Sequence, residues 1–218
     1  MNSREIVVKG IGNAAAIPDI IKLSINIEVN NSDYEKVMSQ SSEMLDNLKA
    51  AVMSAGHDAK DLKTIRFNID AKYKKYREQT GQIQRLTGYT CYHYLELEFS
   101  LDMQLLGATL GAIADCRAKP RFSIRFSVKD PGIVTERLLE NAVENAKRKA
   151  EILAKSASVT LGAIQRIDHS WSEHQFYSPT NYLLCENTIP KYAESMALDI
   201  VPEEIDLSDT VTVVWAIE

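Results

Sequence analysis

Cys91 and His93 are the residues of this sequence whose types and spacing come nearest to those of a nucleophile and its base. They stand two positions apart in a run of alternating apolar and polar residues, so a β-strand would point both side chains to one face. A thiolate is nucleophilic, and an imidazole can take the thiol proton. The same face carries an apolar set: Tyr89, Leu95, Leu97 and Phe99. We therefore predict that Cys91 is an inert core residue, with a nucleophile as the alternative.

A zinc site would have to draw on His169, His174 and Cys185. The spacing of the two histidines is neither the i, i+4 pair of a helical site nor a Cys-x-x-Cys knuckle. We therefore predict no metal and no cofactor. The three cysteines, Cys91, Cys116 and Cys185, are odd in number and far apart, so we expect reduced thiols.

Gly10-Ile11-Gly12-Asn13 is similar to half of a nucleotide-binding loop. Such a loop turns on its glycines and presents backbone N–H groups and a helix N-terminus to a phosphate. Here Pro18 opens a second alternating run, which predicts a strand in place of the helix. Because the helix dipole is missing, we predict a bulge or tight turn at the glycines and no phosphate site.

The run from Lys72 to Arg77, Lys-Tyr-Lys-Lys-Tyr-Arg, mixes basic and aromatic side chains as a nucleic-acid-binding strand does. Its alternation, however, continues an inward-facing set from Ile65 to Ala71 and assigns Tyr73 to that set. The 218-residue chain also has a net charge of −5, from 25 basic and 30 acidic side chains, which disfavours a general nucleic-acid binder. We predict a solvated hairpin end, with lysines that discourage aggregation, and no nucleic-acid partner.

Motifs typical of hydrolases do not stand out in the sequence. There is no Ser-His-Asp order and no His-Glu-x-x-His motif, and the paired acids Glu96 and Glu98 fall on the polar face of their strand. Carboxylates in that position are normally solvated. We therefore predict no catalytic residues and a protein that is not an enzyme.

Periodicity predicts the elements that would carry these residues. Alternation indicates strands over residues 21–29, 65–74 and 89–99, and the last two form a hairpin around a polar turn. Between the first two strands, Ser32 and Glu35 form a capping box that opens a helix.

The second part of the chain repeats this order. A connector helix over residues 102–116 leads to a strand over 122–128, and Asp130-Pro131 then opens a long helix. The apolar stripe of this helix is predicted at Leu139, Ala142, Val143, Ala146, Ala150, Leu153 and Ala157. Strands over residues 163–171 and 205–217 follow.

Set side by side, residues 17–99 and 119–217 both have the order strand, helix, strand, strand. Each helix must bury its stripe on a sheet, so we predict an α+β fold with a common sheet of mixed or antiparallel strands. The halves, joined by the connector helix over 102–116, are predicted to form a single domain of residues 1–218.

Residues 172–204 do not fit this pattern. They show little periodicity and contain Pro179, Pro190 and Pro202, yet they also hold Phe176, Tyr177, Tyr182, Leu183 and Leu184. Loops of this length usually bind something or are disordered. Because so many apolar side chains are unfavourable in water, we expect this segment to pack on its own domain or on a neighbouring subunit.

Neither a membrane-spanning run nor a leader is recognised in the sequence as written. No apolar stretch approaches about 20 residues, and Met1 to Gly10 lacks a basic region followed by an apolar segment. We therefore predict no membrane span and a cytoplasmic protein as written. If a signal peptide preceded the sequence, a periplasmic protein would be expected instead.

Several short patterns together resemble the SIMPL-domain family. They are Gly10-x-Gly12, Pro18-Asp19, Gly88-Tyr89, Ala142-x-x-Asn145-Ala146-x-x-Lys149-Ala150-x-x-Leu153-Ala154, and Leu161-Gly162. Their order and spacing, from Lys9 to the C-terminus, carry the resemblance. Two departures are Ser158, where the family usually has glycine, and the missing signal peptide of exported members.

The resemblance implies an α+β fold of repeated strand and helix units and no established catalytic centre. Bacterial members are associated with oxidative-stress defence or are known as periplasmic immunogenic proteins, and some are similar to ring-forming homo-oligomers. We therefore predict a non-enzymatic protein that self-associates or binds a protein partner, with contact surfaces at residues 172–204 and at the hairpin tip, 74–86. The alternative is an enzyme or small-molecule binder with a pocket near Cys91 and His93.

Overall fold

A computed structural model describes residues 4–78, 81–170, 174–184 and 200–218. The chain divides into two compact units, each assembled from separate stretches of the sequence. Unit 1 comprises Met1–Asp19, Ser127–Pro179 and Pro202–Glu218, and unit 2 comprises Ile20–Phe126 and Thr180–Val201.

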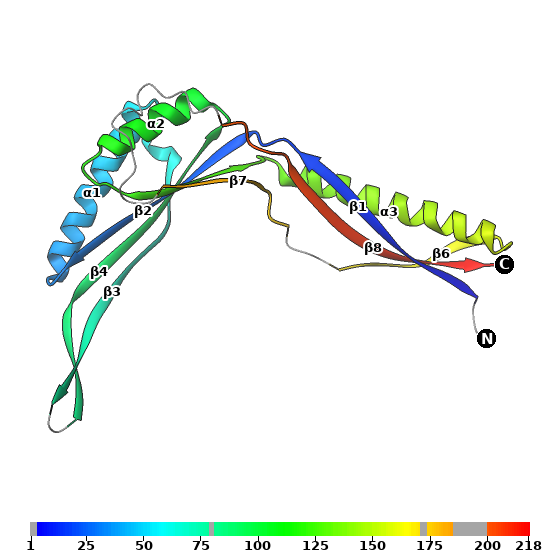
Figure 1. Ribbon diagram of the computed structural model, residues 1–218, viewed down its shortest axis with the longest axis horizontal. Coiled ribbons are helices and arrows are strands. Elements are labelled where there is room, and N and C mark those ends of the chain that lie inside the picture. Colours follow the sequence, from blue (N-terminus) through cyan, green and yellow to red (C-terminus); the bar gives the residue numbers. More distant parts are fainter. Residues whose placement is uncertain (1–3, 79–80, 171–173, 185–199) are drawn as a thin grey trace. The chain divides into compact units, whose positions relative to one another are not determined.

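The sheet of unit 2 has five strands and lies against two helices (Figure 1). In chain order the elements are β2 (Ile20–Asn31), α1 (Tyr34–Ser54), the 3-10 helix η1 (Ala59–Asp61), β3 (Leu62–Glu78), β4 (Gly81–Ser100), α2 (Met103–Asp115), β5 (Arg121–Ser127) and β7 (Tyr177–Leu184). The strand order is β3-β4-β2-β5-β7. β4 pairs antiparallel with both β2 and β3.

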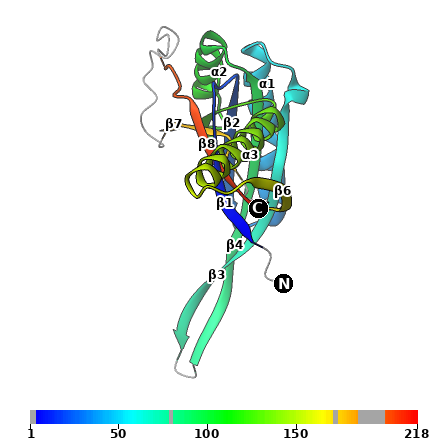
Figure 2. The ribbon, with the colours of Figure 1, turned by 90° about the vertical axis from the view of Figure 1, so that its right-hand side faces the viewer.

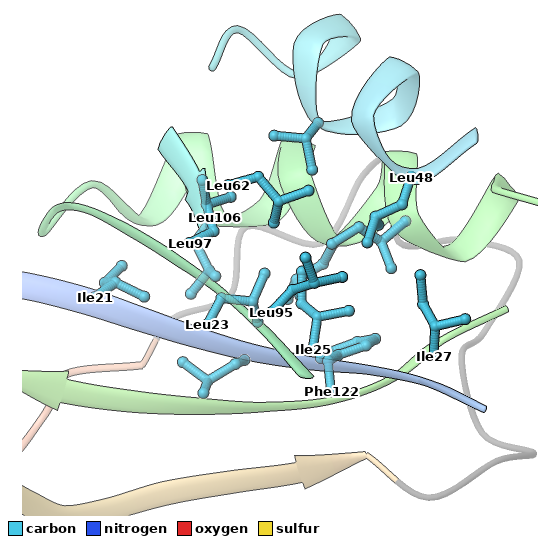
Figure 3. Close-up of a cluster of buried hydrophobic side chains, with 14 of the residues drawn as sticks. Ile21, Leu23, Ile25, Ile27, Leu48, Leu62, Leu95, Leu97, Leu106 and Phe122 are labelled. Carbon is cyan, nitrogen blue, oxygen red and sulfur yellow. The ribbon is translucent and has the colours of Figure 1, made fainter. Parts of the chain in front are cut away.

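The core of unit 2 forms where α1 and α2 cover one face of this sheet (Figure 3). Its largest fully buried side chains are Ile21, Leu23, Ile25, Ile27, Leu48, Leu97, Leu106, Ile113, Ile124 and Phe126. They come from alternate positions of the strands and from one stripe of each helix, as burial of a single face requires. The opposite face of the sheet carries the polar residues of the same alternation.

Unit 1 contains the second sheet and the longest helix (Figure 2). Its elements are β1 (Glu5–Ala16), α3 (Pro131–Ser156), β6 (Leu161–His169) and β8 (Ile205–Ile217), and the strand order is β1-β8-β6. β8 pairs antiparallel with both neighbours. Trp215, Val213 and Val211 of β8 are buried with the alanines of α3.

Helix α3 packs very closely against β1. Its buried residues recur every four positions: Val134, Leu138, Ala142, Ala146, Ala150 and Ala154. A Cβ atom on Gly10 would lie 2.0 Å from the carbonyl oxygen of Ala142, and one on Gly12 would lie 2.0 Å from that of Leu138. The glycines thus allow a close approach of the two backbones. The predicted bulge or tight turn is wrong, because Gly10 and Gly12 lie inside a continuous strand.

Polar side chains of α3 also bind the outer edge of β1. Asn141 Nδ2 donates to the carbonyl oxygen of Asn13 (2.8 Å), and Lys149 Nζ donates to that of Lys9 (3.0 Å). Between them, the N–H of Ile11 donates to Asn145 Oδ1 (3.0 Å). An edge strand exposes backbone groups that invite pairing with another chain, so these bonds protect the edge.

The helix boundaries agree with the sequence prediction except at one cap. Asp130 accepts the N–H of Gly132 at the start of α3, as predicted. α1 begins one residue later than expected, because Asp33 and not Ser32 caps it by accepting the N–H groups of Glu35 and Lys36. The predicted stripe of α3 is also wrong at Val143, Leu153 and Ala157, which are exposed. The buried row instead follows strict four-residue steps, which place Leu138 and Ala154 inside.

The predicted α+β class is confirmed, and the helices and strands occur in the predicted order. The strands form two sheets, however, and not the common sheet that we expected. The reason lies in β5, whose Phe122, Ile124 and Phe126 join the core of unit 2. Helix α3, which follows β5, packs instead on β1 and β8.

Candidate functional site

Cys91 lies in the core of unit 2, beneath α1. Its side chain is fully buried, and its Sγ donates to Ser41 Oγ of α1 at 3.4 Å. This bond joins the thiol to a hydroxyl and not to the imidazole two positions along the strand. The prediction that Cys91 is a core residue is confirmed by this burial.

His93 is only 5% exposed and makes its hydrogen bond to a different element. Its Nε2 lies 2.8 Å from Thr64 Oγ1 of β3, and its ring packs edge-on against Phe67. Nδ1 is buried without a hydrogen-bond partner among the described residues. Burial, and then the charge of Lys49, lowers the pKa of His93 below its ordinary value. The ring is therefore a neutral core group with no geometry for taking a proton from Cys91.

A cluster of two histidines and one aspartate forms in unit 1. His169 Nε2 lies 2.9 Å and His174 Nε2 lies 3.3 Å from Asp209 Oδ2, while the N–H of Thr210 donates to Oδ1 (2.6 Å). Burial by itself raises the pKa of Asp209, but these three hydrogen bonds outweigh it and hold the pKa below its ordinary value. The carboxylate thus connects β6 and the segment after it to β8.

This cluster contains two of the three zinc ligands that we considered, and Cys185 lies outside the described residues. Within the part of the chain that the structure describes, no group of three or more His, Cys, Asp or Glu side chains is arranged to hold a metal ion. Sequence reasoning missed Asp209. The sequence did contain a signal for it, because alternation places Asp209 on the same face of β8 as Val211, Val213 and Trp215. A carboxylate on an apolar face needs hydrogen-bond donors.

The face of the five-stranded sheet opposite α1 and α2 contains a hollow of about 680 Å³. Its lining includes Ser24, Asn26, Arg66, Tyr94, Glu96 and Arg121. The guanidinium of Arg66 lies 4.7 Å from the centre of the Tyr94 ring, and Asn26 Oδ1 is buried without a partner among the described residues. A few polar groups on a mostly apolar wall are typical of small-molecule sites. Sequence reasoning did not predict this hollow, because its residues come from four strands.

The β3–β4 hairpin extends beyond the strand that flanks it. β2 ends at Asn31, opposite Tyr89 of β4, while β3 and β4 continue to pair as far as Glu78 and Gly81 (Figure 1). We call residues 72–78 and 81–88 the ribbon. Its pairing confirms the predicted hairpin.

Most of the described side chains of the ribbon are exposed, and Ile83 is half-buried. Tyr73 is 60% and Leu86 is 47% exposed, and these two residues lie opposite each other. The prediction that Tyr73 faces inward is wrong, since α1 and α2 cover the sheet near β2 and not this end of β3. Lys74 Nζ and the Arg85 guanidinium lie 5.7 Å and 5.8 Å from the centre of the Tyr76 ring.

Most of the aperiodic segment, residues 172–204, lies outside the described residues. Its described part contains a strand, β7, which we did not predict. Phe176 packs against a small core cluster of unit 1, and its carbonyl oxygen accepts the hydroxyl of Ser127 (2.6 Å). Ser178 Oγ donates to the carbonyl oxygen of Glu203 (2.7 Å). The expectation that this segment packs on its own domain is therefore confirmed at Phe176, whereas the bond between Ser178 and Glu203 lies within the segment itself.

Comparison with known proteins assigns the chain to a family. Residues 6–215 match the model of the SIMPL family, described as a protein of unknown function (DUF541). The chain belongs to the SIMPL family. No described helix of this SIMPL protein is both long and apolar enough to cross a membrane.

Two curated relatives are similar over most of the chain. The uncharacterized protein YggE of Edwardsiella ictaluri is 20% identical over 170 residues, which are 78% of this chain and 70% of the relative. The 26 kDa periplasmic immunogenic protein of Brucella melitensis biotype 1 is 25% identical over 164 residues, 74% of this chain and 65% of the relative.

Proposed function

We propose that this SIMPL protein is not an enzyme and acts by self-association, with the ribbon as a contact surface. The observation that carries the proposal is that β3 and β4 continue as two strands after β2 has ended. A two-stranded hairpin is marginally stable in water by itself, whereas a third element that covers it supplies the missing contacts. A second copy of the chain is an available source of such contacts.

Exposed apolar side chains support the same proposal. Tyr73 and Leu86 are paired on one face of the ribbon and Tyr76 lies on the other, and nothing in the described part of unit 2 packs over them. Large apolar side chains that cluster on a surface mark contact sites more often than isolated ones do. The other form of this proposal is that the ribbon binds a different protein. The mass of the purified protein distinguishes self-association from binding to a different protein.

An enzyme or small-molecule binder that uses Cys91 and His93 has less support. The thiol is bonded to Ser41, the imidazole is bonded to Thr64, and both side chains are buried. For the compartment we propose the periplasm, because one relative carries that location in its name. A role in stress response stays a prediction.

Light scattering on the purified chain tests self-association. We expect an oligomer whose mass falls towards that of one chain when residues 74–85 are replaced by an Asn-Gly turn, which closes a two-residue hairpin between Tyr73 and Leu86. The matched control is Ile17→Ser with Val201→Ser, which removes exposed apolar side chains outside the ribbon and should leave the mass unchanged. A wild-type monomer at every concentration, or an unchanged mass after the replacement, would contradict the proposal.

A further inference from the structure

We propose that the ribbon of one copy binds an acidic face of α3 on a second copy. This acidic face consists of Glu136, Glu140 and Glu144. The inference rests on the proposed function, because it names the two surfaces that meet when copies of the chain associate.

The ribbon is strongly basic on a chain that is acidic overall. Residues 72–88 contain five basic side chains and one acidic side chain, whereas the net charge of the chain is −5. Lys74 and Lys75 are both exposed, and neither makes an ion pair with another described residue. They are consecutive residues of β3, which is the outer strand of its sheet, so one points to each side of the exposed edge.

The acidic face of α3 has the opposite charge in a compact arrangement. Glu136, Glu140 and Glu144 are exposed at four-residue intervals, so they form one row along the helix. Like charges at this spacing repel each other, and within the described residues none of the three forms an ion pair. A cationic partner would relieve this repulsion. Arg137 and Lys147 lie beside the row, and Arg148 occupies its next four-residue step, so the acidic row ends at Glu144.

The two surfaces can also meet along the strand edge. Lys74 and Lys75 extend to opposite sides of that edge, and Glu136, Glu140 and Glu144 follow one another at steps of about 6 Å along the helix axis. The chain already uses such a contact internally, because side chains of α3 bind the exposed edge of β1 from another side of the helix. A second helix can therefore lie along the edge of β3, with its carboxylates between Lys74 and Lys75.

An anionic bilayer could also attract a basic, tyrosine-rich hairpin. The second copy is favoured because it supplies a row of three exposed carboxylates on a rigid helix, which can contact the lysines on both sides of the strand edge. The two occupants respond differently to changes in α3, since charge reversal on the helix cannot weaken binding of the ribbon to lipid.

Reversing the charges of each surface in a separate variant, and then mixing the two variants, tests the contact. One variant carries Lys74→Glu and Lys75→Glu, and the other carries Glu140→Lys and Glu144→Lys. All four residues are exposed, so circular dichroism should show unchanged folding. Controls of matched charge on unit 2 are Lys36→Glu with Arg117→Glu, and Glu43→Lys with Asp46→Lys. Mass is measured by light scattering at low salt for each variant alone and for equimolar mixtures, and sedimentation with phosphatidylglycerol vesicles is measured in parallel.

We expect each test variant alone to dissociate at a concentration at least about tenfold higher than the wild type. Mixing the two test variants should restore assembly, because reversed ribbons then meet reversed helices, and the controls should behave as the wild type. The inference is overturned, and self-association stays intact, if the wild type is an oligomer and both test variants have the same mass as the wild type. A mixture of the two test variants that fails to reassemble has the same consequence. A monomeric wild type overturns both. Vesicle binding that depends on Lys74 and Lys75 in a protein of unchanged mass assigns the ribbon to lipid instead.

Discussion

Cys91 and His93 lie close together on one strand, but their side chains form hydrogen bonds with different elements. Both point to the same face of β4, as their spacing requires. Cys91 meets Ser41 of α1, and His93 meets Thr64 of β3. Because a bare acceptor is less unfavourable in a core than an unpaired N–H, the neutral ring carries its proton on Nε2 and donates to Thr64.

The buried ring of His93 should make stability depend on pH. Its folded pKa is lowered from the ordinary 6.5, so the unfolded chain binds a proton at a higher pH than the folded chain does. The free energy of unfolding should therefore be highest above pH 6.5 and fall as the pH drops below it. His57, whose pKa burial also lowers, acts in the same direction. Urea unfolding from pH 8 to pH 5 measures this slope.

His93→Gln should flatten that slope, since glutamine can still hydrogen-bond Thr64 but does not titrate. His57→Gln serves as the comparison and should remove the other part of the slope. A pH slope for His93→Gln that equals the wild-type slope would show that the ring is not protonated on unfolding in this range, contrary to the expectation.

At the scale of elements, the contact between β1 and α3 depends on the absence of side chains. Gly10 and Gly12 face Ala142 and Leu138, while Asn145 and Lys149 bind the strand edge beside them. Gly10-x-Gly12 and the alanine motif of α3, which carried part of the resemblance to the SIMPL family, thus form a packing pattern. They join a strand to a helix more than a hundred positions away.

Gly10→Ala should destabilise unit 1, because the new Cβ would overlap the backbone of α3. We expect a loss of about 1–3 kcal/mol or more, as for other overpacked cores. Thermal unfolding followed by circular dichroism measures it. The matched control is Gly111→Ala in α2, where an added Cβ meets nothing within 4 Å. Alanine favours a helix over glycine by about 0.5–1 kcal/mol, so that variant should be slightly more stable. Equal melting temperatures for the two variants would refute the close-approach argument.

At the scale of the whole molecule, charge is distributed unevenly. The chain has a net charge of −5, yet the ribbon concentrates five basic side chains on two strands. Such a segment attracts polyanions without specificity when salt is low, while the acidic remainder of the chain repels them.

Binding to nucleic acid should therefore be weak and lost at moderate salt. Fluorescence polarisation of a labelled single-stranded oligonucleotide should show little binding at low salt and none near physiological ionic strength. Lys74→Glu with Lys75→Glu should abolish any signal at low salt. Binding that persists as salt increases would mean that bases are recognised, and would contradict a ribbon that serves protein contacts.

The local features of the fold were accessible from the sequence. Alternation located β2, β4 and β5, and Asp130-Pro131 located the start of α3, because these signals repeat within a few residues. The candidate surfaces were less accessible. The hairpin was predicted, but the direction of Tyr73 was not, since alternation tells which residues share a face and not whether another element covers that face.

By itself, the sequence determined the α+β class, the order of the helices and strands other than β1 and β7, membership of the SIMPL family and the burial of Cys91. Tertiary structure alone decided that the strands divide between two sheets, that Gly10 and Gly12 serve helix packing, and that Asp209 joins His169 and His174. The physical reason is the range of the interactions. Periodicity and capping act within one or two turns of chain, whereas the partner of a strand edge or of a buried carboxylate comes from residues far away in the sequence.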